Sequence, residues 1–223
     1  YFFSANYYDE EGIVLSTEFQ RINVRLNSRF KKGKFTIEES FAYNQRDLDQ
    51  NNFYGNNTFT APVVRQFAPE RLGGFEAIDS NLYNGSGGTN NYALANLIND
   101  ETIERNLLGN INVRYEIMEG LTAGLNFGVD YRNTYGNFFS PTFDLSPTDQ
   151  QDNLNELNDL TEVRGEILST NIEPTINYKN RFGKHDIDVL LGGARQQIDN
   201  NSLAIQAEGL PSNNITNIAG FAD

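Results

Sequence analysis

Long runs in which polar and apolar residues alternate are the feature that most constrains the fold of this chain. In "RINVRLNSRF" at 21–30, arginine and asparagine occupy one set of alternate positions and mostly apolar residues the other. Successive side chains of a β-strand point to opposite faces, so this period predicts strands with one polar and one apolar face. Segments of this kind lie at about 1–8, 17–30, 34–46, 106–117, 121–135, 168–179 and 185–197. The sequence therefore predicts an all-β, antiparallel fold of about seven strands.

The connections between these segments alternate between two lengths. Short turns such as "KKG" at 31–33, "MEG" at 118–120 and "RFGK" at 181–184 contrast with loops at 47–104 and 136–163. Short turns at one rim and long loops at the other are typical of outer-membrane barrels, whose turns are periplasmic and whose loops are extracellular. Several segments also reach the ~9–11 residues that a tilted strand needs to cross a bilayer. The pattern predicts a sector of a transmembrane β-barrel.

The two faces then acquire different surroundings. We expect the apolar face to meet the lipid bilayer and the polar face to line the lumen. Phe30, Phe35, Tyr115 and Tyr178 fit one interfacial belt of aromatic residues, and Tyr43, Tyr131 and Tyr135 fit the other. Two residues depart from the apolar pattern. Glu39 interrupts the apolar face of its strand, and Pro174 cannot donate to a strand ladder, which predicts a bulge or weak pairing there.

Seven strands do not make a complete barrel. Bacterial single-chain barrels close with an even number of strands, and an unpaired edge leaves backbone groups unsatisfied in lipid. The chain also begins at Tyr1 directly on a strand-like pattern. We therefore expect a piece of a larger barrel.

Composition excludes several classes of function. A net charge of −13 argues against a nucleic-acid partner, because phosphate binding requires a basic surface. The absence of cysteine and the single His185 leave no thiolate or histidine-rich metal site. No apolar run is long enough for a membrane-spanning helix. The sequence predicts a protein that is not an enzyme and that has neither a metal nor a cofactor.

Three stretches resemble a known family. "YFFSANYYDEEGIVLSTEFQRINVRLNSRF", "GNINVRYEIMEGLTAGLNFGVDY" and "NIEPTINYKNRFGKHDIDVLLGG" are similar to barrel hairpins of the SusC/RagA-type TonB-dependent transporters of Bacteroidetes. The resemblance covers nearly the whole chain apart from the variable long loops. It is specific for the family and does not identify the substrate.

The resemblance implies an outer-membrane importer of a Gram-negative bacterium. Its barrel of 22 strands would enclose a plug domain, and a SusD-like surface lipoprotein would cap it as a lid. Oligosaccharides or peptides would be taken up with energy from the TonB complex. Residues 1–223 would be the N-terminal part of the barrel domain, without the plug, the TonB-contacting segment or the remaining strands.

Two groups of residues are candidate sites. We name the first the arginine ladder, and we expect it to face the plug through donors to carboxylates or carbonyls. It comprises Arg21, Asn23, Arg25, Asn27 and Arg29. The second group consists of loop aromatics that contact a ligand or the lid, or that pack the loop on itself. It comprises Phe53, Tyr54, Phe67, Tyr83 and Tyr92.

Other motifs carry weaker expectations. "NGSGGTNN" at 84–91 is expected to be a loop tip that opens no helix, so it is not a phosphate cradle. The stretch from Asp47 lacks the glycine and glutamate of an EF-hand. Asp186 and Asp188 share one strand face, where we expect them near the periplasmic rim facing the plug. Leucines at spacing three in 145–162 predict a short helix.

Two other classes of function remain open at this point. One is a plug-less outer-membrane porin or adhesin barrel, although a water-filled lumen has no need of the arginine ladder. The other is a soluble carbohydrate-binding β-sandwich. A solvated face would normally carry lysine and glutamate, whereas this polar face is rich in asparagine, threonine, serine, glycine and arginine.

Overall fold

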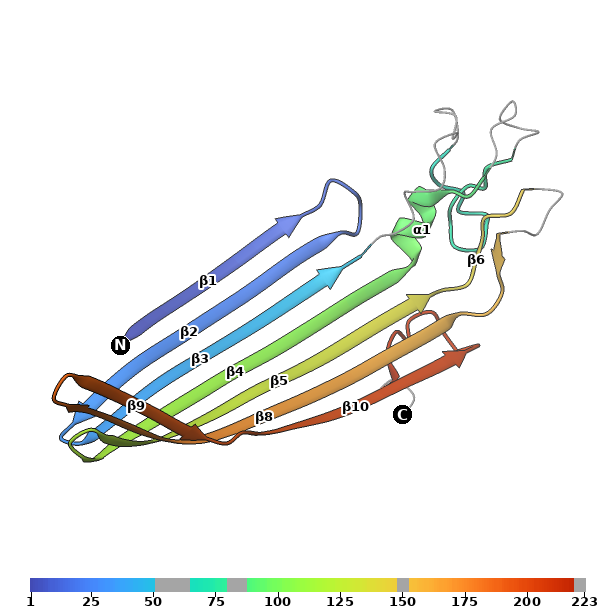
Figure 1. Cartoon of the computed structure of the whole chain (residues 1–223). Helices are drawn as coiled ribbons and strands as arrows, with labels where there is room; N and C mark the ends of the chain where they lie inside the picture. Colours follow the sequence, from blue (N-terminus) through green and yellow to red (C-terminus); the bar gives the residue numbers. More distant parts are fainter. Residues whose placement is uncertain (51–64, 80–87, 148–152, 219–223) are drawn as a thin grey trace.

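A computed structural model describes residues 1–50, 65–79, 88–147 and 153–218. Its strands are β1 (Phe2–Glu11), β2 (Glu18–Lys32), β3 (Phe35–Asp49), β4 (Asn99–Met118), β5 (Leu121–Ser140), β6 (Phe143–Asp144), β7 (Leu154–Asn155), β8 (Asp159–Phe182), β9 (His185–Gly192) and β10 (Arg195–Glu208), and its helix is α1 (Asn91–Leu97). The long strands form one antiparallel sheet in the order β1-β2-β3-β4-β5-β8-β10, and β9 pairs with β8 (Figure 1). The predicted all-β antiparallel fold is confirmed.

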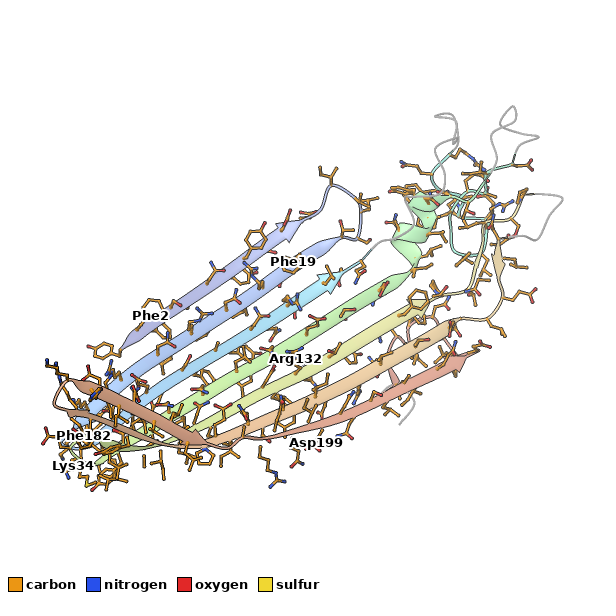
Figure 2. All side chains as sticks on the ribbon, viewed as in Figure 1. Phe2, Phe19, Lys34, Arg132, Phe182 and Asp199 are labelled. Carbon is orange, nitrogen blue, oxygen red and sulfur yellow. The ribbon has the colours of Figure 1, made fainter. Side chains whose placement is uncertain are left out.

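The sheet is a single layer. Its side chains are drawn in Figure 2, and among the described residues the one other sheet is the two-stranded pair β6-β7. The buried hydrophobic residues of the described chain lie at the long-loop end, for example Leu145 and Leu160, whereas Phe41 and Phe127 in mid-sheet are 42% and 43% exposed. The accessible surface of 14930 Å² exceeds the roughly 10,000 Å² expected for a compact protein of this mass. A soluble β-sandwich is therefore wrong, because a sandwich buries one face of each sheet.

Strand register confirms the predicted faces. Ile37 pairs with both Phe30 and Val113, and Val113 pairs with Leu125, so apolar residues form rows across the sheet. On the other face, Asn44 pairs with Asn23 and Asn106. Paired residues of adjacent strands share a face, so alternation within each strand becomes two continuous surfaces.

Successive hairpins are staggered. Phe35 begins β3 and pairs with Tyr115, but β4 continues to Met118 before its turn. Leu121 begins β5 and pairs with Tyr178, but β8 continues to Phe182. Each turn therefore lies further along the strand direction than the preceding one, a stagger of the kind that tilted strands of a β-barrel also show.

The pairing of β8 is interrupted opposite Pro174, as the sequence predicted. Thr175 pairs with Gly192 and Ile172 with Arg195, so β9 and β10 continue one register on either side of the break. Gly193 N–H donates to the Pro174 carbonyl at 3.1 Å. Pro174 has no N–H, so the reciprocal hydrogen bond of the strand ladder at this position cannot form.

The loops form a small body of their own, which we call the loop body and define as 65–79, 88–98, 141–147 and 153–158. Ala93, Phe143 and Leu145 are its buried centre, with Phe75, Leu94 and Leu97 packed around them. In Figure 1 it stands beyond the ends of β4 and β5. The Ser16 hydroxyl, in the connection between β1 and β2, donates to the Ala95 carbonyl at 2.6 Å. No helix in the described part of the chain has the length and apolar character to cross a membrane.

An ion cluster stabilises the loop body. The side chain of Glu76 is 7% exposed and lies 2.6 Å from Arg65 Nη2 and 3.6 Å from Arg71 Nε. Arg71 also donates to the Ser146 carbonyl at 2.8 Å, which ties the two long loops together. At the exposed edge of the cluster, Glu70 accepts from its own backbone N–H and from Arg65, and these contacts lower the pKa of its carboxyl.

Several expectations for the loops need correction. The strands run further than predicted, so the loops span 50–98 and 141–158 rather than 47–104 and 136–163. The helix predicted in 145–162 is wrong for the described residues, which form β7 at Leu154–Asn155 and enter β8 at Asp159. The stretch 84–91 does open a helix, because Asn90 caps α1 by accepting from Ala93 N–H. In 145–162 the leucine spacing did not produce a helix, because Leu154 pairs in β7 with Asp144 of β6. The observed helix, α1, begins where the Asn90 side chain caps it.

Replacing Pro174 by valine should restore the missing donor opposite Gly193. We expect the full-length protein to gain about 0.5–1.5 kcal/mol in its free energy of unfolding, the usual net value of one such hydrogen bond. Denaturant unfolding of the refolded protein measures this. A loss of stability would show instead that the wall requires the break.

Replacing Glu76 by glutamine should loosen the loop body and leave the sheet intact. Removing one partner of a buried ion pair costs about 3–5 kcal/mol, and here the cost should be smaller because Arg65 is 61% exposed and can be hydrated. Amide exchange in α1 should still accelerate. Exchange in β4 and β5 serves as the internal reference. Glu70→Gln is the matched control, because that carboxylate is exposed and should contribute little. Equal exchange in both variants would contradict the assignment.

Candidate functional site on the polar face of the sheet

The arginine ladder lies entirely on the polar face of β2. Its residues pair with Tyr8, Asn6, Ser4 and Phe2 on β1, and with Arg46, Asn44, Ala42, Ser40 and Glu38 on β3. The predicted alternation is therefore correct for every member. Asn23 and Asn44 are joined by a side-chain hydrogen bond, and the ladder continues across the sheet as a polar surface.

Most arginines of this surface are neutralised by carboxylates of the sheet itself. Glu38 on β3 lies 3.3 Å from Arg29 and 2.8 Å from Arg114, so one carboxylate serves two cations. Arg132 contacts Asp130 at 2.8 Å, and Arg46 pairs with Glu104. The charges of Arg29, Arg46, Arg114 and Arg132 thus have partners within the wall.

Arg21 and Arg25 differ from these arginines. Among the described residues, neither has a carboxylate within ion-pair distance. The residue opposite Arg21 on β3 is another cation, Arg46. The Arg21 guanidinium lies 5.7 Å from the centre of the Tyr8 ring, and its Nε is buried without a hydrogen-bond partner. Arg25 faces Ser4 and Ala42. These two arginines are cations whose hydrogen-bonding capacity the wall leaves unused.

A hollow of about 550 Å³ adjoins the ladder on the same face. Arg46, Glu104 and Arg132 line it, together with the amides Asn44, Asn106 and Asn200. Gly165 pairs with Thr134 in its wall, and the missing side chain at Gly165 leaves space. Charged and amide groups here offer both donors and acceptors to a polar ligand.

The loop aromatics are only partly described. Phe53, Tyr54 and Tyr83 lie outside the described residues. Phe67 and Tyr92 come together with Phe75, with ring centres 5.4–6.1 Å apart. For these two residues, packing of the loop on itself accounts for most of the contact, although Phe67 remains 54% exposed. Phe75 completes the group and was not among the predicted residues; its spacing from Phe67 gave no periodic signal.

Asp186 and Asp188 are both engaged by cations of the neighbouring strand. Both lie on β9 near the short-turn end, and each meets a cation of β8. Asp186 lies 3.6 Å from Arg181, and Asp188 lies 3.6 Å from Lys179 and accepts from Asn177 at 2.8 Å. These are pairs within the wall. No cluster of three acidic or histidine side chains suited to a metal ion occurs in the described part of the chain.

Comparisons with known proteins agree with the resemblance seen in the sequence. The chain is 26% identical over 97% of its length to TonB-dependent receptor P26 of Formosa agariphila, and 25% identical over its full length to TonB-dependent receptor P3 of the same organism. It spans 22% of the length of each. No family model matches the sequence.

Solved structures show the same fold. The RagAB peptide transporter superposes over 97% of this chain with a TM-score of 0.70 at 16% identity, and the RagAB peptide importer in its open-open state gives 0.71 at 19% identity. The chain covers 25% and 24% of those chains. The resemblance to SusC/RagA-type TonB-dependent transporters is confirmed: the chain is similar in sequence to TonB-dependent receptors and has the fold of one sector of the RagAB transporter's β-barrel.

Proposed function

We propose that this chain is part of the wall of a TonB-dependent importer in the outer membrane of a Gram-negative bacterium. The observation that carries the proposal is the single-layer sheet with one apolar and one polar face. An exposed apolar face of this extent is stable only where lipid or protein covers it. At about 3.3 Å per residue and a tilt of about 40°, the stretch from Phe35 to Tyr43 covers about 20 Å along the membrane normal, close to the ~25 Å of a barrel's apolar band.

Aromatic residues border this band on the apolar face. Phe35 and Tyr115 are in contact near the short turns, with ring centres 4.5 Å apart. Tyr43 and Tyr131 lie at the other limit, both in register with Leu107. Belts at these two levels support a sheet that spans the membrane, and by the pattern of outer-membrane barrels the short turns would be periplasmic and the loop body would lie outside the cell.

The substrate class that we propose is peptide, with oligosaccharide as the alternative. Support comes from the RagAB structures, which are named as a peptide transporter and a peptide importer. By the same analogy, the loop body would face a SusD-like lipoprotein lid, and energy would come from the TonB complex. The hollow beside Arg46 and Glu104 offers charged groups of both signs, which suits the amide and charged groups of a peptide.

Arg21 and Arg25 would hold the plug domain of the full-length protein. A guanidinium presents donors in a fixed fork that matches a carboxylate or two carbonyls. The wall satisfies its other ladder arginine, Arg29, so the capacity left for the plug is concentrated in these two. We therefore propose that Arg21 and Arg25, which lie in the half of the arginine ladder nearer the long loops, make the main contacts to the plug.

Deleting the full-length gene should abolish uptake of the substrate class. We expect cells that lack it to lose accumulation of labelled oligopeptides, and complementation to restore it. Labelled oligosaccharides serve as the parallel arm. Loss of oligosaccharide uptake alone would correct the substrate class, and unchanged uptake of both would overturn the importer.

Replacing Arg21 and Arg25 together by alanine in the full-length protein should loosen the plug. Hydrogen bonds to charged groups contribute about 1.5–3 kcal/mol each, so amide exchange of the plug should accelerate while the fold of the wall persists. Arg29→Ala is the matched control, because Arg29 is paired with Glu38 inside the wall. Equal plug protection in the double variant, the control and the wild type would refute the assignment.

A further inference from the structure

Glu39 stands on the apolar face of the sheet at the middle of the apolar band. It lies on β3 midway between Phe35 and Tyr43, with Ile37 and Phe41 as its neighbours along the same face. Across the sheet it pairs with Ser28 on β2 and Ile111 on β4. On β2, β3, β4, β5, β8 and β9, Glu39 is the one charged side chain of this face between the aromatic belts. On β10, Arg195 and Asp199 share the face, since they pair with Ile172 and Leu168 of β8. Neither touches Glu39, because β4, β5 and β8 lie between β3 and β10.

The wall does little to satisfy this carboxylate. The Ser28 hydroxyl donates to Glu39 Oε2 at 2.9 Å, and both side chains are exposed. Leu26, Phe30 and Ile111 around it are 44%, 57% and 44% exposed, so the surrounding surface is hydrocarbon. The nearby cations, Arg29 and Arg114, belong to the opposite face and contact Glu38 instead. A carboxylate with about four acceptor sites thus has one donor.

Such a group is unfavourable in a bilayer. Charged side chains at the bilayer centre are rare, and those that persist are usually paired and functional. Headgroups lie too far away at this depth. The inference rests on the proposed function, because it requires the apolar face to lie in the membrane. Within that setting, the missing feature is a cationic or hydrogen-bonding partner at the same depth.

We propose that Glu39 and Ser28 mark a lateral contact with a second membrane-spanning protein, whose lipid-facing surface presents a lysine or arginine at the bilayer midplane. Charge complementarity selects this partner. A two-fold contact between copies through the same strands would set Glu39 against Glu39, and like charges oppose each other. Leu26, Phe41 and Ile111 would form the apolar surround that excludes lipid and strengthens the ion pair.

The test uses the full-length protein extracted from native outer membranes into lipid nanodiscs. A photo-crosslinking residue at position 26 reports what lies against this face. We expect a crosslink to a peptide of another membrane protein that carries a lysine or arginine, and we expect Glu39→Leu to reduce crosslinking by at least about tenfold. Ile176→Leu on β8 is the matched control, because Ile176 lies on the same face, 48% exposed and away from the proposed contact, and it should leave the crosslink in place.

Charge reversal makes the assignment specific. Glu39→Lys should abolish the crosslink, and exchanging the partner's crosslinked cation for glutamate should restore it. A crosslink that survives Glu39→Leu, or a partner peptide without a cation, overturns the proposal. So does a Glu39→Leu variant that is more stable than wild type in native membranes, because a carboxylate facing lipid alone is a liability that leucine removes.

Failure of this inference is distinguishable from failure of the proposed function. A protein that imports its substrate normally but shows no Glu39-dependent crosslink loses only the lateral contact. A protein that is released from membranes without detergent loses both, because then the apolar face does not meet lipid. Uptake by the Glu39→Leu variant is therefore measured in the same cells.

Discussion

The structure depends on one constraint, the exposure of both faces of a single-layer sheet. A sheet in water hides one face against a second layer, and the burial of that face supplies its stability. Here the mid-sheet residues of both faces stay open, so the hydrophobic contribution of the apolar face must come from what surrounds it. Backbone hydrogen bonds join the strands, and the stability of the sheet further depends on what covers each of its two faces. This division explains why the packed cores of the described residues lie only at the long-loop end.

On the polar face, most arginines are paired with a carboxylate on the same or an adjacent strand. Glu38 contacts Arg29 and Arg114 on the two adjacent strands, and Asp130 contacts Arg132 on its own strand and accepts from Asn106 on the next, so each acid lies beside the cations that it neutralises. In a surface packed against another polar body, such pairing limits the cost of removing water. The exceptions, Arg21 and Arg25, are therefore the arginines of this surface that are free for the proposed contact outside the sheet.

The sequence predicted the strands because period-two alternation records the environment of each face directly. The same pattern predicted which residues share a face, and the register of the structure, with Ile37 opposite Val113, agrees with it. The break at Pro174 followed from the absent N–H. The loops were predicted poorly for a physical reason: their structure depends on contacts between distant segments, such as Arg71 with Ser146 and Ala93 with Phe143, which leave no period in the sequence. Likewise the pairing of Arg29, and the lack of pairing at Arg21 and Arg25, depend on which residues the register places opposite them.

The hydrogen bond from Ser16 to Ala95 has a mechanical consequence. Ser16 adopts a positive φ of 57°, a backbone conformation that a residue with a side chain rarely takes, and its hydroxyl fastens the strained turn to the end of α1. The turn leads through Thr17 into β2, and Arg21 follows near the start of that strand. One hydrogen bond therefore fixes the loop body to the start of the strand that carries the arginine ladder.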